Sequence, residues 1–417
     1  MRKLILSAAA LFLLAVVLFT CGRPDDNGDD AATRPAVTQP EPAPQPPRRV
    51  SAPSVGFQRF DPAVLEHYRL DPAWRAAAER DRLARVPGGA ARPGAPAPVA
   101  PTTEPPPPLT TAVPLTTSVP EDEEAGEPGM LAAQVLLGRA GFSPGVIDGR
   151  GGQNTDKALY WFQFARGLTP TGTLDDPTRR ELERAGGGGA VVDVEVTAED
   201  VAGPFTEVPE DVYEQAELEC LCYASAVEAI AERYHTTPEL LAELNPDADL
   251  DALAAGARLR VPNVEPLARG NQRAAGAAGQ EVAQLVVSKR GFYTQALDGQ
   301  GRILYHFPST IGSKYDPSPQ GQFKVTGVAF NPPFHYQPTL FHEVPDEEPE
   351  AQLPEGPNSP VGLVWIDLSK PHHGIHGTAV PETIGYTSSH GCIRLTNWDA
   401  LFLARRVRPG VPVHFRE

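Results

Sequence analysis

The stretch IHGTAVPETIGYTSSHGCIRLTN, residues 375–397, concentrates reactive side chains within one short segment. The chain of 417 residues has only 4 cysteines and 10 histidines, yet Cys392, His390 and His376 all fall here. A cysteine attacks as its thiolate, whose formation needs a base or a cation close by. In an extended segment the side chains of His390 and Cys392 would point the same way, and His376 lies far enough upstream for a loop to return a second strand beside the first.

Glycines separate these groups within the stretch. Gly377 and Gly391 allow backbone N–H and C=O groups to approach a substrate closely, and a backbone donor beside the nucleophile is what an oxyanion hole requires. Two other interpretations stay open on spacing alone. Cys392 could be an inert core thiol among surface histidines. A zinc site could instead draw its ligands from His372, His373, His376, His390 and Cys392, but no standard zinc spacing is met, so we expect neither a metal nor another cofactor.

The residues around this stretch, 281–417, predict a mostly-β domain. EVAQLVVSKR, GFYTQALD and RILYHFPSTIG alternate apolar and polar residues, and GQFKVTGVAF and VGLVWIDLS continue the pattern. TNWDALFLARRV predicts one helix, with Asn397 as its cap. We therefore expect a β-sandwich or β-barrel with a helix packed on it.

The motifs of this domain resemble those of YkuD-type L,D-transpeptidases. The resemblance rests on IHGT, IG and SHGCIRLTN, with PSPQGQFKV and GPNSPVGLVWIDLS upstream. It implies that Cys392 is the nucleophile and that His376 is the general base, oriented by the Gly377 carbonyl. It also implies roles for the neighbouring residues: His390 near the oxyanion site, the N–H groups of Gly391 and Cys392 binding the oxyanion, Ser389 supporting by a hydrogen bond, Arg394 positioning an anionic peptide or the local loop, and Asn397 capping the helix.

The reaction that the resemblance implies is acyl transfer from a tetrapeptide stem of peptidoglycan through a Cys392 thioester. The acceptor would be a second stem, giving 3–3 crosslinks, or a protein such as a lipoprotein, or another amine. Water as acceptor would make the protein an L,D-carboxypeptidase or a crosslink-cleaving peptidase. A wall-binding scaffold without catalysis is the alternative from another class, and the intact set of site residues argues against it. The Pro-rich residues 329–360 are long for a loop and suggest a lid that excludes water.

Two further units precede this domain, so the expected fold is multidomain α+β. Residues 128–186 predict three short helices, and IDG, the FQ pair and TGTLD resemble a peptidoglycan-binding module. Residues 219–264 predict helix, turn, helix and strand, with Thr236 or Thr237 capping a helix that starts at Pro238. The NP pair and LRVPN resemble a βααβ LysM module, which binds glycan. The usual opening Gly-Asp pair is missing, so a structural spacer is the alternative.

The N-terminus predicts that the protein is exported to the bacterial cell envelope and lies in the periplasm. Residues 1–21 combine a basic MRK with an apolar run that ends at Cys21, which fits a cleaved signal peptide, a lipoprotein signal or a retained membrane anchor. Residues 22–127 are Pro-rich and predict a disordered linker, although residues 61–86 could form short helices. The net charge of −17 argues against nucleic acid as a partner. Cys220 and Cys222 are too close in sequence for us to predict a disulfide between them.

Overall fold

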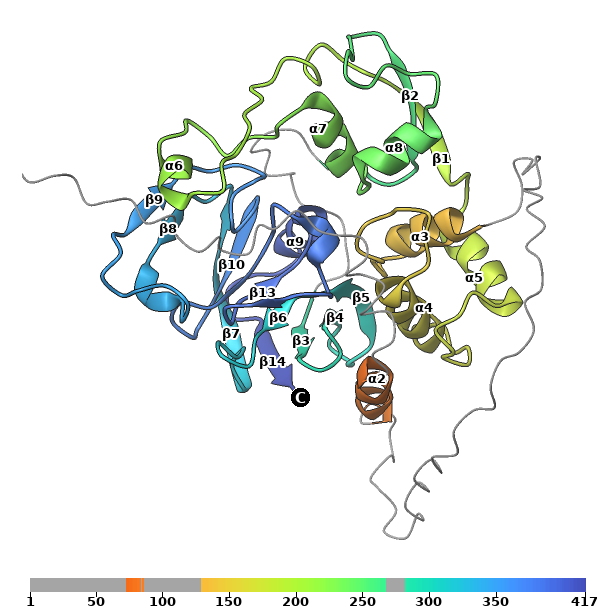
Figure 1. Cartoon of the computed structure of the whole chain (residues 1–417). Helices are drawn as coiled ribbons and strands as arrows, with labels where there is room; N and C mark the ends of the chain where they lie inside the picture. Colours follow the sequence, from red (N-terminus) through yellow and green to blue (C-terminus); the bar gives the residue numbers. More distant parts are fainter. Residues whose placement is uncertain (1–72, 84, 86–128, 268–281) are drawn as a thin grey trace, which may run out of the picture. The chain divides into compact units, whose positions relative to one another are not determined.

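The computed structural model describes residues 73–83, 85, 129–267 and 282–417 (Figure 1). The predicted signal and most of the predicted linker lie outside these residues. Helix α2 (Ala73–Leu83) is the described part of residues 61–86, and the Tyr160 hydroxyl donates to its Glu79 carboxylate at 2.6 Å. Within the described part of the chain, no helix has both the length and the apolar character needed to cross a membrane.

The first unit contains the three helices expected for residues 128–186. They are α3 (Met130–Arg139), α4 (Gln153–Ala165) and α5 (Asp176–Gly186). Asp175 caps α5 by accepting the Thr178 N–H at 2.9 Å. Trp161 and Phe162 of α4 are completely buried and form part of the core of this unit.

The second unit pairs two strands around two helices. Strand β1 (Val191–Glu195) lies antiparallel to β2 (Arg258–Pro262), with α7 (Ala226–Arg233) and α8 (Pro238–Leu244) between them in sequence. The unit therefore begins upstream of the predicted boundary at residue 219, because its first strand lies far from α7 in the chain. Thr237 caps α8 as predicted, by accepting the Leu240 N–H at 3.2 Å.

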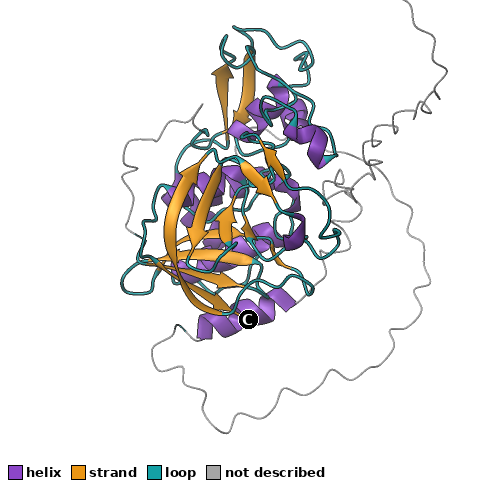
Figure 2. Cartoon of the chain, turned by 90° about the vertical axis from the view of Figure 1, so that its left-hand side faces the viewer, coloured by secondary structure: helices purple, strands orange, loops and turns teal. Residues whose placement is uncertain are grey.

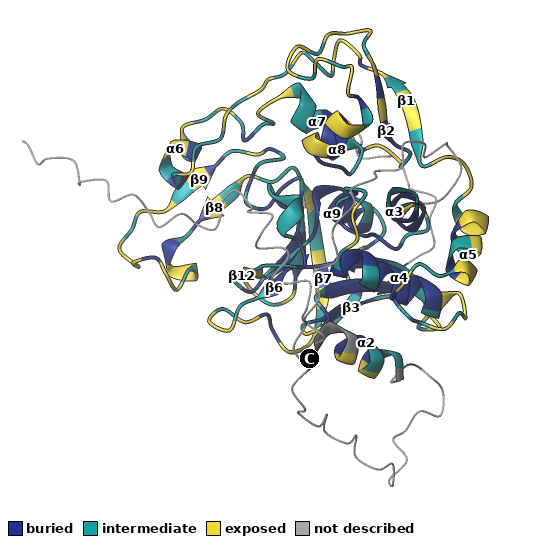
Figure 3. Cartoon of the chain, turned by 45° about the vertical axis from the view of Figure 1, so that its right-hand side comes forward, coloured by how far each residue is buried: buried dark blue, intermediate teal, exposed yellow. Residues whose placement is uncertain are grey.

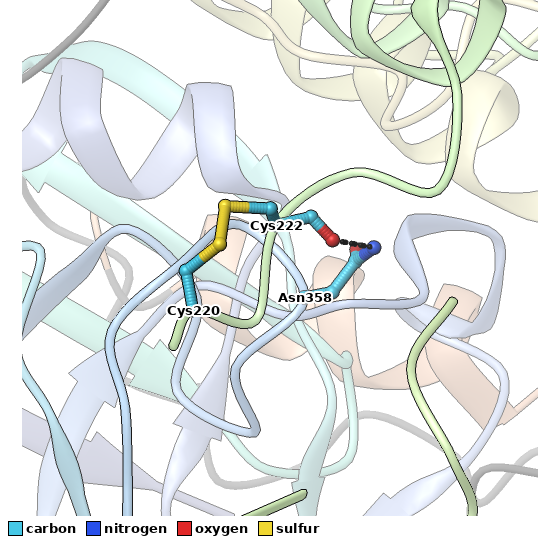
Figure 4. The surroundings of a disulfide bond; sticks show 3 residues. All are labelled: Cys220, Cys222 and Asn358. Carbon is cyan, nitrogen blue, oxygen red and sulfur yellow. Dashed lines mark hydrogen bonds between the residues drawn. A yellow bond between two sulfur atoms is a disulfide. The ribbon is translucent and has the colours of Figure 1, made fainter. Parts of the chain in front are cut away.

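A segment between β1 and α7 leaves this unit and contacts the C-terminal domain. It carries the short helix α6 (Val212–Ala216) and a disulfide between Cys220 and Cys222 (Figure 4). We had not predicted this bridge across one residue, but the two Cα atoms are 5.2 Å apart, within the range that a disulfide spans. The Cys222 carbonyl accepts a hydrogen bond from the Asn358 side chain at 3.0 Å, which fastens the bridge to the C-terminal domain.

The C-terminal domain is built on one curled eight-stranded sheet (Figure 2), in the order β13-β11-β10-β7-β14-β3-β4-β5. The strands are β3 (Gln284–Ser288), β4 (Tyr293–Leu297), β5 (Ile303–Pro308), β7 (Gly321–Phe330), β10 (Val364–Leu368), β11 (Gly374–His376), β13 (Ile393–Arg394) and β14 (Pro412–Arg416). The last strand, β14, lies between β7 and β3 and pairs with both, so it joins the two halves of the sheet. The predicted mostly-β domain is confirmed.

Helix α9 (Asn397–Ala404) packs on this sheet and is almost wholly buried (Figure 3). Its N-cap is Thr396, whose hydroxyl accepts the Asp399 N–H at 3.2 Å. The prediction that Asn397 caps the helix is therefore wrong by one residue. Because Thr396 takes the capping position, Asn397 becomes the first helical residue and its amide is free to bond elsewhere.

Residues 329–360 are more ordered than one long loop. Strand β8 (Phe334–Tyr336) lies antiparallel to β9 (Ala351–Leu353), with a 3-10 turn, η1 (Pro338–Leu340), between them. We call residues 334–353 the hairpin. A second short pair, β6 (Ile311–Gly312) and β12 (Ser388–Ser389), is parallel, and a further 3-10 turn, η2 (Pro381–Thr383), precedes β12.

Specific contacts join the units. Ser143 of the first unit donates to the Asp399 carboxylate of α9 at 2.8 Å. The ring of His235, from the second unit, stacks on Trp398 at 5.1 Å with planes 7° apart. The Thr236 hydroxyl donates to the Ile147 carbonyl at 2.6 Å, linking the first unit to the second. Both units thus contribute to the surroundings of α9.

Candidate active site

One cavity of about 360 Å³ collects most of the predicted site residues. Its walls include Cys392, His376, His390, Ser389 and Arg394 from the motif, with His372 beside them. Much of the remaining wall comes from the hairpin and from α6, including Tyr336, Phe341, Val212 and Gln215. The fold therefore brings the motif residues together with residues that lie far from them in the sequence.

Two short parallel strands place the histidine beside the cysteine segment. His376 ends β11 and lies opposite Arg394 of β13, two residues after Cys392. Gly374 opens space next to this histidine, since a Cβ at that position would lie 2.6 Å from the Trp365 ring. The Trp365 ring can therefore stack on the His376 imidazole, at 5.3 Å between centroids and 17° between planes.

The tautomer of His376 follows from its hydrogen bond. Its Nδ1 lies 2.7 Å from the Gly377 carbonyl oxygen. A carbonyl only accepts hydrogen bonds, so Nδ1 carries the proton and Nε2 keeps its lone pair. Burial lowers the pKa of His376 to about 3, and the charge of Arg394 acts in the same direction. The imidazole is therefore neutral at physiological pH and able to accept a proton at Nε2.

The thiol of Cys392 is half-buried, and its Sγ lies 3.7 Å from the His372 carbonyl oxygen. Burial raises the pKa of this thiol, while a hydrogen bond from the Gly374 backbone and the charge of Arg394 act against the rise. The thiol is therefore protonated in the free protein. Cys392 and His376 line the same cavity and are both neutral in the free protein, so the thiolate has to be made by proton transfer during reaction.

The backbone around the cysteine is shaped by three small residues. Gly391 has φ +104°, a conformation that favours glycine. Its carbonyl accepts the Ser318 hydroxyl at 2.7 Å, and the Ser389 hydroxyl donates to the Cys392 carbonyl at 2.5 Å. With both carbonyls held in this way, the turn that carries the Cys392 N–H is fixed from two sides.

Asn397 supports the site from behind instead of lining it. Its Oδ1 accepts the Leu363 N–H at 3.0 Å, and its amide nitrogen donates to Glu232 at 2.6 Å. This position depends on Gly377, because a Cβ there would lie 2.0 Å from the Asn397 oxygen. Gly377 thus serves both neighbours: its carbonyl orients His376, and its missing side chain admits Asn397.

His390 faces the hairpin. Its Nε2 lies 2.6 Å from the Glu343 carboxylate, and its ring meets Phe341 edge-on at 4.9 Å between centroids. Neither partner was predicted, and neither was Trp365 beside His376. No motif marks these three residues, and only the folded chain brings them to the cavity. The expectation that a lid-like segment adjoins the site had pointed to the right region without naming its residues.

The comparisons with known proteins agree with this geometry. Residues 283–415 match the family described as the L,D-transpeptidase catalytic domain, YkuD. The C-terminal domain is an L,D-transpeptidase catalytic domain. Residues 126–182 match a peptidoglycan binding domain, which places the three-helix unit in that family. Both resemblances seen in the sequence are thereby confirmed, whereas the LysM-like interpretation of the second unit stays a prediction.

Several curated proteins are similar to this L,D-transpeptidase domain and its surroundings. A Bacillus licheniformis protein named as L,D-transpeptidase YkuD is 29% identical over 187 residues, covering 45% of this chain and 91% of that protein. Its Bacillus subtilis namesake is 31% identical over 123 residues, covering 30% and 60%. The solved L,D-transpeptidase of Xylanimonas cellulosilytica is 14% identical and covers 73% of this chain and 100% of that one, at a TM-score of 0.31, from which we infer nothing.

Proposed function

We propose that the protein is an exported cysteine L,D-transpeptidase that remodels peptidoglycan. The observation that carries the proposal is that Cys392 lines the same cavity as a neutral His376, whose Nδ1 donates to the Gly377 carbonyl and so leaves the lone pair of Nε2 to act as the base. The family of the C-terminal domain and the peptidoglycan binding domain in front of it support the same substrate.

In the proposed mechanism, Cys392 Sγ attacks the carbonyl of the amide between the third residue of a tetrapeptide stem and its terminal D-Ala. His376 Nε2 takes the thiol proton as the bond forms. The backbone N–H groups of Gly391 and Cys392 stabilise the oxyanion. The C–N bond then breaks, D-Ala leaves with the proton from His376, and a thioester remains. The amine of a second stem attacks this thioester, a 3–3 crosslink forms, and the thiol is restored.

Arg394 is proposed to bind the stem. Arg394 lines the cavity and lies opposite His376 in the strand pair, where a cation would hold a peptide carboxylate or the local loop. His390 is proposed to lie near the oxyanion and help hold it, with Ser389 fixing the Cys392 backbone. Asn397 is proposed as a supporting residue, because it contacts Gly377 and Glu232 instead of the cavity.

The acyl acceptor is a separate part of the proposal. The amine of a second stem is the leading acceptor, with a lipoprotein or another amine as further acceptors; water would make the enzyme a carboxypeptidase. The second unit is proposed to bind glycan as a LysM-like module. The N-terminal residues 1–21 are proposed to deliver the protein to the periplasm, either released or attached to the membrane through an anchor or a lipid on Cys21.

Intact-protein mass spectrometry tests the chemistry. The full chain would be incubated with purified disaccharide-tetrapeptide, beside Cys392→Ala and His376→Ala. We expect an acyl-enzyme that lacks D-Ala, followed by a dimeric muropeptide. Loss of the nucleophile should reduce turnover at least about 10⁴-fold, and loss of the base about 10²- to 10⁴-fold. Tripeptide without dimer would favour the carboxypeptidase, and no adduct would contradict the proposal.

A further inference from the structure

Four metal-ligating side chains meet at the edge of the active-site cavity. The possible ligand atoms of Asp316, His342, Glu343 and His390 all lie within 4.8 Å of one another. His342 Nδ1 lies 2.6 Å from the Asp316 carboxylate and 3.0 Å from that of Glu343. The other oxygen of Glu343 lies 2.6 Å from His390 Nε2. Each imidazole thus directs one nitrogen at carboxylates, and Glu343 bridges the two rings.

The four residues come from three separate segments. Asp316 follows β6, His342 and Glu343 belong to the hairpin, and His390 precedes the nucleophile in the Ser-His-Gly-Cys turn. These segments are far apart in sequence, so no local motif would reveal the set. A ligand bound to all four would hold the hairpin against the turn that carries Cys392.

The chemistry of the set suits a transition-metal dication. Two imidazoles and two carboxylates are ligands for zinc and for neighbouring metals of intermediate softness. Zinc bonds of about 2.0–2.2 Å to such ligands put neighbouring ligand atoms about 3.3 Å apart in a tetrahedron. The contacts seen here are shorter by roughly half an ångström, so small rotations of the side chains would open the space for an ion.

The two imidazoles are held by aromatic neighbours. The Tyr315 ring stacks on His342 at 4.9 Å between centroids with planes 22° apart, and Phe341 meets His390 edge-on. Asp316 and His390 are partly buried, with 20% and 22% of their side chains accessible, whereas His342 and Glu343 are exposed. The cluster is therefore oriented before binding yet open to an ion from solvent, which reduces the ordering cost of coordination.

We propose that Asp316, His342, Glu343 and His390 bind one divalent cation of the zinc class and so fasten the hairpin to the Ser-His-Gly-Cys turn. The alternative for the same contacts is a set of ion pairs with protonated histidines and no metal. The proposal does not depend on the proposed function, because it concerns ligands outside the Cys392–His376 pair. It does bear on His390: a cation at Nε2 places the ring proton on Nδ1, an atom without a hydrogen-bond partner among the described residues.

Metal titration of the full chain tests the proposal. The protein would carry Cys392→Ala, so that the thiol cannot act as a ligand, and would first be freed of metal with a chelator. Zn²⁺ would be titrated by calorimetry and Co²⁺ by its d–d absorption. We expect one equivalent of each to bind. His342→Ala and Glu343→Gln should weaken binding at least tenfold, since each removes one of four ligands.

His335→Ala is the matched control. His335 lies on the same hairpin and pairs with Glu350 at 3.0 Å, but it is not part of the cluster. This variant should bind Zn²⁺ with unchanged affinity. Hydrogen exchange of residues 337–350 should also slow on adding Zn²⁺ to the control and not to His342→Ala. Absence of a Zn²⁺ or Co²⁺ equivalent, or equal affinity in the His342→Ala and His335→Ala variants, would overturn the assignment.

Discussion

The amide nitrogen of Asn397 donates to a side-chain oxygen of Glu232 at 2.6 Å, which joins α7 of the second unit to the first residue of α9. Only 7% of Glu232 is exposed, and burial raises its pKa to about 8 from an ordinary 4.5, although the bond from Asn397 acts in the opposite direction. Glu232 is therefore neutral in the folded protein at pH 7. A buried acid thus supports the residue that packs on Gly377 behind the active site.

This contact predicts how stability changes with pH. Between about 4.5 and 8 the unfolded chain ionises Glu232 while the folded protein keeps it protonated, so the free energy of unfolding falls as pH rises through this window. Glu232→Gln retains an oxygen that accepts from Asn397 and removes the titration. We expect the thermal midpoint of this variant to depend less steeply on pH over that window.

The matched control is Glu243→Gln. Glu243 lies on α8, is exposed and pairs with Arg150 at 2.9 Å, so its removal should leave the slope of the wild-type protein unchanged. Part of the slope should survive in Glu232→Gln as well, because burial raises the pKa of Asp399 to about 7 and this acid contributes with the same sign. An identical slope in the wild-type protein and Glu232→Gln would show that the carboxyl ionises freely in the folded state.

The environment of Cys392 predicts an unusual alkylation profile. Burial raises the thiol pKa and the nearby Arg394 charge opposes that rise. Iodoacetamide should therefore modify Cys392 only above the pH range of an ordinary thiol. Arg394→Gln should move the profile further upward, and mass spectrometry of the labelled protein at a series of pH values measures both.

Arg405→Gln is a suitable comparison for Arg394→Gln. Arg405 follows α9 and borders a different cavity, so its charge should not reach the thiol. A profile with its midpoint below that of free cysteine would contradict the neutral Cys392–His376 pair. It would mean that the folded protein stores a thiolate–imidazolium pair before substrate binds.

The local features of this fold were predictable because they depend on neighbours in sequence. Helix α8 with Thr237 and Pro238, the three helices of the first unit, and the alternating strands β3, β4 and β5 all follow from short patterns. The His376–Gly377 bond also joins neighbours in sequence, but it was expected only because the resemblance to L,D-transpeptidases implied it. The predicted N-cap of α9 was wrong by one residue because Thr396 and Asn397 are both good capping residues.

The long-range features could not be predicted, because they depend on packing between distant segments. Glu343 reaches His390 only after the hairpin folds onto the Ser-His-Gly-Cys turn, and Trp365 reaches His376 only because Gly374 has no side chain. The strand β1 was missed as the start of the second unit, since the segment with the Cys220–Cys222 disulfide separates it from α7. Each of these features depends on tertiary contacts between segments that are distant in the sequence.

Leu221, between the two bridged cysteines, should be important for stability. It is completely buried in a cluster with Tyr336 and Leu353 of the hairpin. Its N–H donates to the Glu355 carbonyl at 3.0 Å and its carbonyl accepts the Asn358 N–H at 2.9 Å. Leu221→Ala should lower the free energy of unfolding by about 2–5 kcal/mol, as for other buried leucines, measured by denaturant titration.

A control for this prediction is Leu340→Ala, on the exposed side of the hairpin. Leu340 is 40% exposed, so its truncation should change stability by less than about 1 kcal/mol. Equal effects of the two substitutions would indicate that the segment around the disulfide does not hold the hairpin. A larger loss for Leu221→Ala would confirm that residues 220–222 anchor it.

The hairpin should control the fate of the acyl-enzyme. Phe341 and Tyr336 line the cavity that holds Cys392, so residues 337–350 can limit the access of water to a thioester. Tyr336 and Ala351 face each other in the β8–β9 pair, which lets an Asn-Gly turn replace residues 337–350 without disturbing either strand. We expect this deletion to raise hydrolysis relative to crosslink formation several-fold, read as the ratio of tripeptide to dimeric muropeptide.

The deletion also removes His342 and Glu343, so the double variant His342→Ala/Glu343→Gln, with the hairpin intact, must be run beside it. A ratio that stays at the wild-type value in the deletion would show that the hairpin does not shield the thioester, and a rise of equal size in both variants would assign the shielding to the ligand cluster instead of to the apolar wall.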